Sequence, residues 1–305
     1  MTVAVASRAS GAARRRLVTR RRSAWDRLRR DPLLLGACAL LSAVVGAAAL
    51  APLIASIDPT RVDPRLRLAP LGTAGHVLGT DQLGRDMLSR TLWGGRVSLV
   101  VGIVPVACSA LVGTGVGLVA GYYGGALDHV VTRTLDVLFA FPAVLLALAI
   151  VSALGPSIFN AMLAITIVAI PSFARLVRSL VLGLRQRAFV EAARSIGAGT
   201  RRILIRHVLP NTVSHVIVYG TFETGKTIVF AAALSFLGLG VQPPTPEWGA
   251  MLSEGRTVLA TAWHVATIPG LAIFLVSLSL NVLGDGVRDA LDPRQTAGAS
   301  QSDAA

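Results

Sequence analysis

One short segment in the second half of the chain has the residues of a phosphate-binding loop. In "YGTFETGKTIVF" (219–230), Gly220, Gly225, Lys226 and Thr227 fit G-x-x-x-x-G-K-[ST], in which backbone N–H groups and a lysine hold nucleotide phosphates. The apolar residues before the pattern are compatible with a strand, and those after it with a helix. Taken alone, these residues would predict a nucleotide site.

Composition argues against a soluble nucleotide hydrolase. The 305 residues are 53% hydrophobic and 15% charged, with a mean hydropathy of +0.65, whereas soluble domains carry about 25% charged residues. Cys38 and Cys108 both lie in apolar runs, so neither a disulfide nor a thiolate metal site is expected. The five histidines show no metal-ligand spacing, and no metal site is predicted. The composition indicates a membrane protein.

Six apolar segments have about the 20 residues that a membrane-spanning helix needs. They are residues 33–57, 97–121, 137–154, 157–173, a helix within 213–241, and 262–284. Six spans place both termini on the same side of the membrane. The predicted fold class is therefore all-α, a polytopic membrane protein with six transmembrane helices and a core over residues 97–287.

Arginine distribution sets the predicted orientation. The arm 1–32 is rich in arginine and precedes an uncharged span, so it is interpreted as a positive-inside anchor rather than a nucleic-acid tail. The loop 174–212 is also arginine-rich and falls on the same side. We therefore expect both termini, including the tail 288–305, to be cytoplasmic. The loops 58–96 and 242–261 are expected outside.

The cytoplasmic stretch "FVEAARSIGAGTRRILIRHVLPN" (189–211) is the most informative in the chain. It predicts a short helix with an alanine face, a break at Gly197 and Gly199, and a second basic helix that ends at Pro210. Small residues at the break predict close contact between the two pieces. Such a unit is suited to docking on a soluble protein, and the residues alone leave open an amphipathic segment lying on anionic lipid.

The same stretch resembles the EAA loop of ABC importer permeases. The matching residues are Glu191, Ala192, Ala193, Gly197, Leu209 and Pro210, while His207 stands where the general pattern has isoleucine. Residues 78–99, 234–252 and 283–294 resemble the second permease subunit of dipeptide, oligopeptide and nickel importers. The likeness extends from about Leu78 to Arg294.

The resemblance implies a multi-pass permease subunit in the bacterial cell membrane, forming half of a pathway for peptides or similar small solutes. It implies a second permease subunit, two ATPase subunits and an extracytoplasmic substrate-binding protein as partners, with membrane lipid around the chain and no nucleic acid. The loop at about 188–210 would seat in a cleft on an ATPase. ATP and magnesium would bind the partner ATPases, so this subunit is expected to hold no cofactor and no catalytic residue. Peptide, nickel and other small cargoes all stay open.

The external loops allow two interpretations each. Asp81, Arg85 and Asp86 are candidates for contact with the binding protein, or they form a turn in which Arg85 pairs with its own neighbours. Glu247 and Trp248 are further contact candidates in "PPTPEWG". This segment is otherwise a stiff cap over the pore mouth, with Trp248 as a possible interfacial anchor.

The phosphate-loop pattern therefore falls inside a predicted span, and the match is interpreted as a coincidence. Glu223 and Lys226 stand three residues apart and can pair on one helical face. Charges inside a span usually face a bundle interior or a wet cavity, so both are candidates for the translocation path. The alternative function is an ion-gradient-driven carrier with Glu223 as its coupling site.

Overall fold

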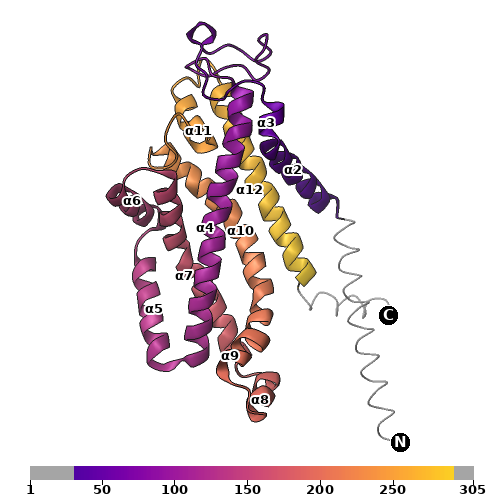
Figure 1. The fold of residues 1–305 in the computed structure, drawn as a ribbon, viewed down its shortest axis with the longest axis vertical. Coiled ribbons are helices and arrows are strands. Elements are labelled where there is room, and N and C mark those ends of the chain that lie inside the picture. Colours follow the sequence, from indigo (N-terminus) through magenta and orange to yellow (C-terminus); the bar gives the residue numbers. More distant parts are fainter. Residues whose placement is uncertain (1–30, 292–305) are drawn as a thin grey trace, which may run out of the picture.

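The computed structural model describes residues 31–291, an elongated helical bundle (Figure 1). Residues 1–30 of the basic arm and 292–305 of the tail lie outside the described part, and so do the predictions made for them. The α-helices are α2 (Pro32–Ala49), α3 (Ala51–Ile54), α4 (Met87–Tyr123), α5 (Gly125–Ala140), α6 (Ala143–Leu154), α7 (Ile158–Leu184), α8 (Ala188–Ser195), α9 (Thr200–Ile203), α10 (Leu209–Phe236), α11 (Trp248–Arg256) and α12 (His264–Leu291), and there is a short 3-10 helix at Pro64–Leu66 and a π-helical turn at Leu204–Val208. Within residues 31–291 there is no β-strand, only two isolated bridges. The all-α prediction is confirmed.

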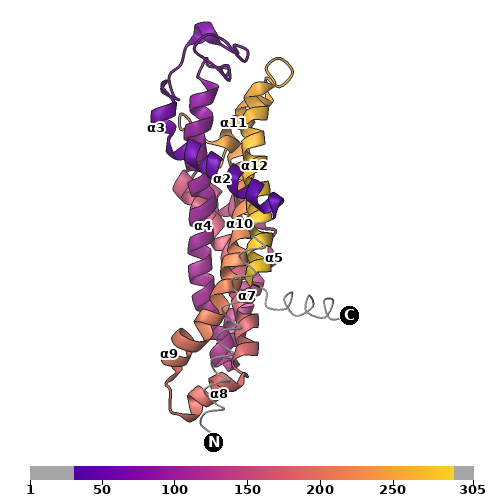
Figure 2. The same ribbon diagram turned by 90° about the vertical axis from the view of Figure 1, so that its right-hand side faces the viewer.

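The number of spans is only partly what the sequence predicts. By length and hydropathy α2, α4, α7 and α12 can each cross a membrane, and α5 with α6 makes a fifth candidate that is bent by 89°. The predicted fifth span, α10, is one continuous helix but falls outside this set. In both views it runs beside α4 and α12, and it contacts both (Figures 1 and 2).

Two helices extend well beyond their predicted ends. Helix α4 begins at Met87, not at residue 97, because the Asp86 carboxylate caps it by accepting the Ser89 N–H at 2.7 Å. Helix α7 continues past residue 173 to Leu184. At 1.5 Å per residue α4 is about 55 Å long, so it extends beyond a hydrocarbon core of about 30 Å.

Three glycines allow α4 and α7 to pack closely. Gly113, Gly117 and Gly121 recur every four residues along α4, the spacing that lets membrane helices approach. A Cβ at Gly117 would lie 2.5 Å from the Ala174 carbonyl oxygen, and one at Gly113 would lie 2.6 Å from the Phe173 Cβ. The α4–α7 interface, the most extensive in the bundle, depends on these missing side chains.

The segments that carry the predicted functions lie at opposite ends of the bundle. The chain between α3 and α4 lies at one end of the long axis together with α11, and α8 and α9 lie at the other (Figure 1). This separation is what a membrane protein with one external and one internal working surface requires.

Candidate functional site

The coupling element (residues 188–208) folds as two short helices at one end of the bundle. It is held by an apolar cluster shared with the end of α7, whose buried members are Val177, Val181, Val190, Ala193, Ile203 and Val208. Because Val190 and Ala193 stand three residues apart on α8, one side of that helix packs inward and the other stays free. Glu191 and Ala192 are on the exposed side. The coupling element is therefore rigidly joined to a long helix of the bundle.

A groove separates the free sides of α8 and α9. Its volume is about 430 Å³, and it is lined by Phe189, Ala192 and Ile196 on one side and by Arg202 and Arg206 on the other. Ile196 is 84% exposed and Phe189 is 42% exposed. Large apolar side chains left in water beside a basic rim are typical of a protein contact surface.

Gly197 acts through its backbone and not through close helix contact. Its φ of +80° gives the left-handed turn between α8 and α9, and a Cβ placed there would meet nothing within 4 Å. The predicted close contact at this residue is therefore wrong. Glycine is needed because other residues adopt that φ only at a cost.

Pro210 does not end the second basic helix, as the sequence predicts, because the chain stays helical from α9 into α10. A π-helical turn at Leu204–Val208 comes just before Leu209 and Pro210. The wider turn accommodates a ring that has no N–H to donate and would clash with an ordinary preceding turn. Leu209 donates its N–H to the Leu204 carbonyl. The coupling element thus continues directly into α10.

Glu223 and Lys226 lie on α10, as predicted, and pair there. The Lys226 Nζ is 3.7 Å from the Glu223 Oε2, and both side chains line a cavity of about 470 Å³. Gly220, Gly225 and Thr227 are all inside the same helix. Their N–H groups take part in a helical ladder, whereas a phosphate-binding loop needs them turned outward between a strand and a helix. The helical conformation supports the view that the pattern is a coincidence.

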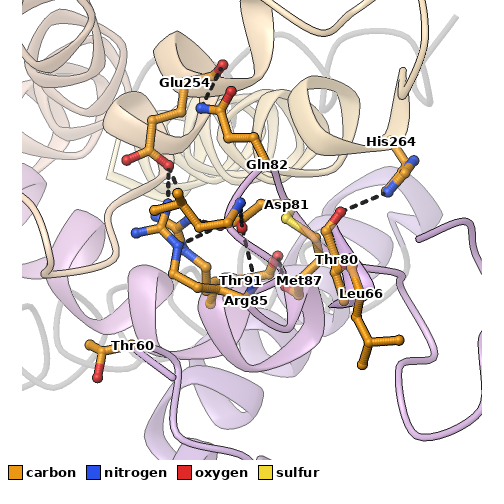
Figure 3. A network of polar contacts seen from close by, with 12 residues as sticks. Thr60, Leu66, Thr80, Asp81, Gln82, Arg85, Met87, Thr91, Glu254 and His264 are labelled. Atoms are coloured by element: carbon orange, nitrogen blue, oxygen red, sulfur yellow. Dashed lines mark hydrogen bonds and ion pairs between the residues drawn. The ribbon is translucent and has the colours of Figure 1, made fainter. Parts of the chain in front are cut away.

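At the other end of the bundle, four charged side chains form a network, three of them buried and the fourth, Glu254, partly buried (Figure 3). Asp81 accepts from the Arg85 Nε at 2.6 Å and also from the Arg90 Nη1. Glu254 of α11 accepts from the Arg85 Nη2 at 2.7 Å and from the Arg90 Nη1 at 2.9 Å. Asp81, Arg85 and Arg90 are at most 3% exposed. The network ties the segment before α4 to α11.

Burial opposes the ionisation of Asp81, but its hydrogen-bonded surroundings outweigh that effect. The Arg90 charge, the N–H of Arg85, the Arg85 charge and the N–H of Leu83 together hold the pKa of Asp81 below its ordinary value. Asp81 is therefore a carboxylate at neutral pH. Asp86 has a separate task, since it caps α4 and also accepts from the His76 Nδ1 at 2.8 Å.

Glu247 and Trp248 are buried at the start of α11. Glu247 caps the helix by accepting the N–H groups of Gly249 and Ala250, and it accepts from the Ser98 hydroxyl at 2.9 Å. The Trp248 indole donates to the Thr91 carbonyl at 2.9 Å and is 2% exposed. Trp248 is thus a core residue, and the interfacial-anchor interpretation is wrong.

The candidates for binding-protein contact are therefore internal. Asp81, Arg85, Asp86, Glu247 and Trp248 are each at most 3% exposed. Their burial favours the alternative of an internally paired turn, while any contact with a binding protein stays a prediction. Sequence reasoning missed Arg90 and Glu254. Arg90 could have been found, since it lies nine residues after Asp81 in the same polar run, but nothing local singles out Glu254.

Comparison of the sequence with known protein families gives a clear match. The profile described as "Binding-protein-dependent transport system inner membrane component" matches residues 113–297, more than half of the chain. The chain belongs to that family. A second profile, the N-terminal transmembrane domain of oligopeptide transport permease C, matches residues 19–70.

Relatives and solved structures agree with this placement. This permease is 49% identical over 270 residues to the glutathione transport system permease protein GsiD of Escherichia coli strain 536, covering 88% of this chain and 89% of that one. It is 46% identical over 273 residues to GsiD of Pectobacterium atrosepticum, covering 90% and 91%. An inward-facing structure of the MetNI methionine ABC transporter aligns with a TM-score of 0.53 at 20% identity, over 65% of this chain and 95% of that one. The last comparison shows the fold alone.

The permease is thus a subunit of an ABC importer of the peptide and oligopeptide type, located in the inner membrane. Membership implies ATPase and substrate-binding partners in general, and the relatives are themselves transport permease subunits. The alternative of a self-sufficient ion-gradient carrier is not favoured. Among residues 31–291 no group of three or more histidine, cysteine or acidic side chains could hold a metal ion.

Proposed function

We propose that this permease forms one half of an importer for short peptides of the size of glutathione. Its partners would be a second permease subunit, two ATPase subunits and an extracytoplasmic substrate-binding protein. ATP and magnesium would be bound by the ATPases, leaving this chain without a cofactor and without catalysis of its own. The 49% identity to GsiD over 88% of the chain is the observation that supports the cargo.

The coupling element would be the ATPase docking surface. Its groove offers exposed Phe189 and Ile196 beside Arg202 and Arg206, and Glu191 lies on the exposed side of α8. A docked ATPase would fill this groove, and the continuous helix from α9 into α10 would transmit its movement to the cavity at Glu223 and Lys226. A rigid lever of this kind converts domain closure into a change of access.

Ile196→Asp tests this docking. A charge in an apolar contact costs several kcal/mol, so we expect the variant permease pair to insert normally but to lose co-purification with the ATPase subunits. Val77→Asp is the matched control, because Val77 is 67% exposed at the opposite end of the bundle. Normal ATPase retention by Ile196→Asp would overturn the docking surface.

The cargo is tested separately with the complete importer in proteoliposomes. We expect ATP-dependent uptake of labelled glutathione or trialanine when the binding protein is supplied. Uptake of neither peptide would show that the cargo is assigned wrongly, and uptake of nickel by the same importer would identify the alternative cargo.

A further inference from the structure

The cavity beside Glu223 and Lys226 lies where α5 bends sharply into α6. Phe141 and Pro142 occupy the break, and α7 and α10 close the other sides. Its volume of about 470 Å³ falls within the range of about 300–1,000 Å³ that small-molecule pockets have. Broken helices at membrane depth are tolerated where they line a cavity, and transporters use them for solute binding.

The wall of this cavity combines apolar rings with a few polar groups. Phe139, Phe141 and Phe230 supply aromatic surface. The only polar side chains among its lining residues are Ser172, Glu223, Lys226 and Thr227. A mostly apolar wall with a small, convergent polar set is the usual composition of a specific solute site.

The two charged groups are close enough to attract each other, but they leave each other's hydrogen-bonding capacity unfilled. Their separation of 3.7 Å exceeds the 2.7–3.2 Å of a hydrogen bond, so each can still bind another group. The Glu223 side chain is 17% exposed, whereas the Lys226 side chain is 68% exposed and has three donors to offer. A carboxylate and an ammonium present the charges that are opposite to the two charges of a zwitterion.

Lys226 lies too deep along α10 to reach either end of the helix. It is about 26 Å along the axis from Leu209 and about 15 Å from Phe236, at 1.5 Å per residue. An ammonium facing hydrocarbon at such a depth is strongly unfavourable. The open side of the cavity therefore faces water or a neighbouring subunit, as a translocation path does.

The first turn of α6 adds a second positive group. Its N-terminal residue Ala143 and the preceding Pro142 both line the cavity, and no side chain caps this helix. The free N–H groups of an uncapped first turn favour an anion. Lys226 and the first turn of α6 thus offer positive charge to a carboxylate, and Glu223, whose Oε2 is 3.7 Å from the Lys226 Nζ, offers negative charge to an ammonium.

We propose that this cavity is a recognition site for a zwitterionic solute within the translocation path. The carboxylate of a short peptide binds Lys226 and the first turn of α6, its ammonium binds Glu223, and its side chains contact the phenylalanines. The inference rests on the proposed function and deepens it, because the permease then selects among the solutes that the binding protein delivers.

The test combines peptides that lack one terminal charge with permease variants that lack the side chain proposed to bind that charge. The complete importer is reconstituted, and the probe is whichever of glutathione and trialanine the wild type takes up, in its free, N-acetylated and carboxyl-amidated forms. Each is supplied at a concentration that saturates the binding protein. We expect Lys226→Met to slow uptake of the free peptide about ten-fold while changing that of the amide little. Glu223→Gln should do the same to the free peptide and spare the N-acetylated form.

Val229→Met on the same helix is the control, since Val229 is exposed and does not line the cavity. It should transport all three forms at the wild-type rate, and all variants should keep ATP hydrolysis that responds to the loaded binding protein. If the Lys226 and Glu223 variants slow the uptake of all three peptide forms equally, or slow none of them, the recognition site is overturned. The Glu223–Lys226 pair would then have a structural role only. A wild-type importer that takes up neither peptide would instead overturn the proposed cargo.

Discussion

Arg90 joins two carboxylates, Asp81 before α4 and Glu254 on α11, and Glu254 lies 164 residues after Arg90 in the chain. Burying a guanidinium is costly unless acceptors surround it. Here Arg85 and Arg90 face Asp81 and Glu254, so the four formal charges cancel. One polar atom of the group, the Arg90 Nε, has no hydrogen-bond partner. The network is therefore sensitive to the loss of any single charge.

Asp81→Asn should destabilise the permease strongly. It leaves two buried guanidinium groups with one carboxylate, and breaking a buried pair from one side costs about 3–5 kcal/mol. Thermal unfolding in detergent measures the effect. Asp58→Asn is the matched control because Asp58 is exposed, and it should not change the melting temperature. A small and equal effect of both changes would contradict the structural role of the network.

The same variant also gives a prediction for pH. The pKa of Asp81 is lowered in the folded chain, so its stabilising effect is fully present above the unfolded value of about 3.9 and is lost as the pH falls through the lower folded value. Wild type and Asp81→Asn should therefore converge in melting temperature as the pH is lowered below about 4. A difference that stays constant over that range would show that the Asp81 charge is not the cause.

At the scale of elements, the contact between α4 and α7 is set by glycine. Gly117→Ala places a Cβ 2.5 Å from the Ala174 carbonyl oxygen, and overpacking of this kind costs about 1–3 kcal/mol. Gly115→Ala is two residues away on the same helix and meets nothing within 4 Å. It should be neutral or slightly stabilising, because alanine favours a helix over glycine. Equal melting temperatures for the two variants would disprove the close α4–α7 contact.

The turn between α8 and α9 is the second element that depends on one residue. At the φ of +80° found for Gly197, a β-branched side chain is strained, whereas asparagine tolerates this region. We expect Gly197→Val to uncouple ATP hydrolysis from peptide uptake and Gly197→Asn to keep most of the coupling. Transport measured together with ATPase activity in proteoliposomes distinguishes them. Equal loss of coupling in both variants would show that the size of the side chain at this position matters, and not the backbone conformation.

Some of these elements can be predicted from the sequence and others cannot, for physical reasons. Long apolar runs gave the helices, since burial in lipid follows composition. The α4 start at Met87 was missed because the run "GRDMLSR" is polar, and its helicity comes from the Asp86 cap and from burial. The sequence predicts a helix end at Pro210, and it does so wrongly because a π-helical turn cannot be inferred from residue types. Glu254, the second partner of Arg90, makes a long-range contact that no local pattern predicts.

At the scale of the whole molecule, the polar surfaces are distributed to the two ends of a long bundle. The coupling element with α8 and α9 lies at one end, and α11, which carries Glu254 of the network, lies toward the other (Figure 1). Glu223 and Lys226 lie between them on α10. Because α10 continues directly from α9, movement of the coupling element can reach the cavity without an intervening hinge. This arrangement has a function only if the coupling element faces the cytoplasm.

Cysteine labelling tests that orientation. The chain has two native cysteines, so Cys38 and Cys108 are first replaced by alanine. Single cysteines are then introduced at Ala74, Thr245 and Ser195, all of them exposed. Arginines are retained on the cytoplasmic side, and the arginine-rich coupling element carries Ser195. A membrane-impermeant maleimide added to intact spheroplasts should therefore label the first two sites, and Ser195→Cys only after permeabilisation. Labelling of Ser195→Cys from outside would reverse the bundle in the membrane and remove the coupling element from any cytoplasmic ATPase.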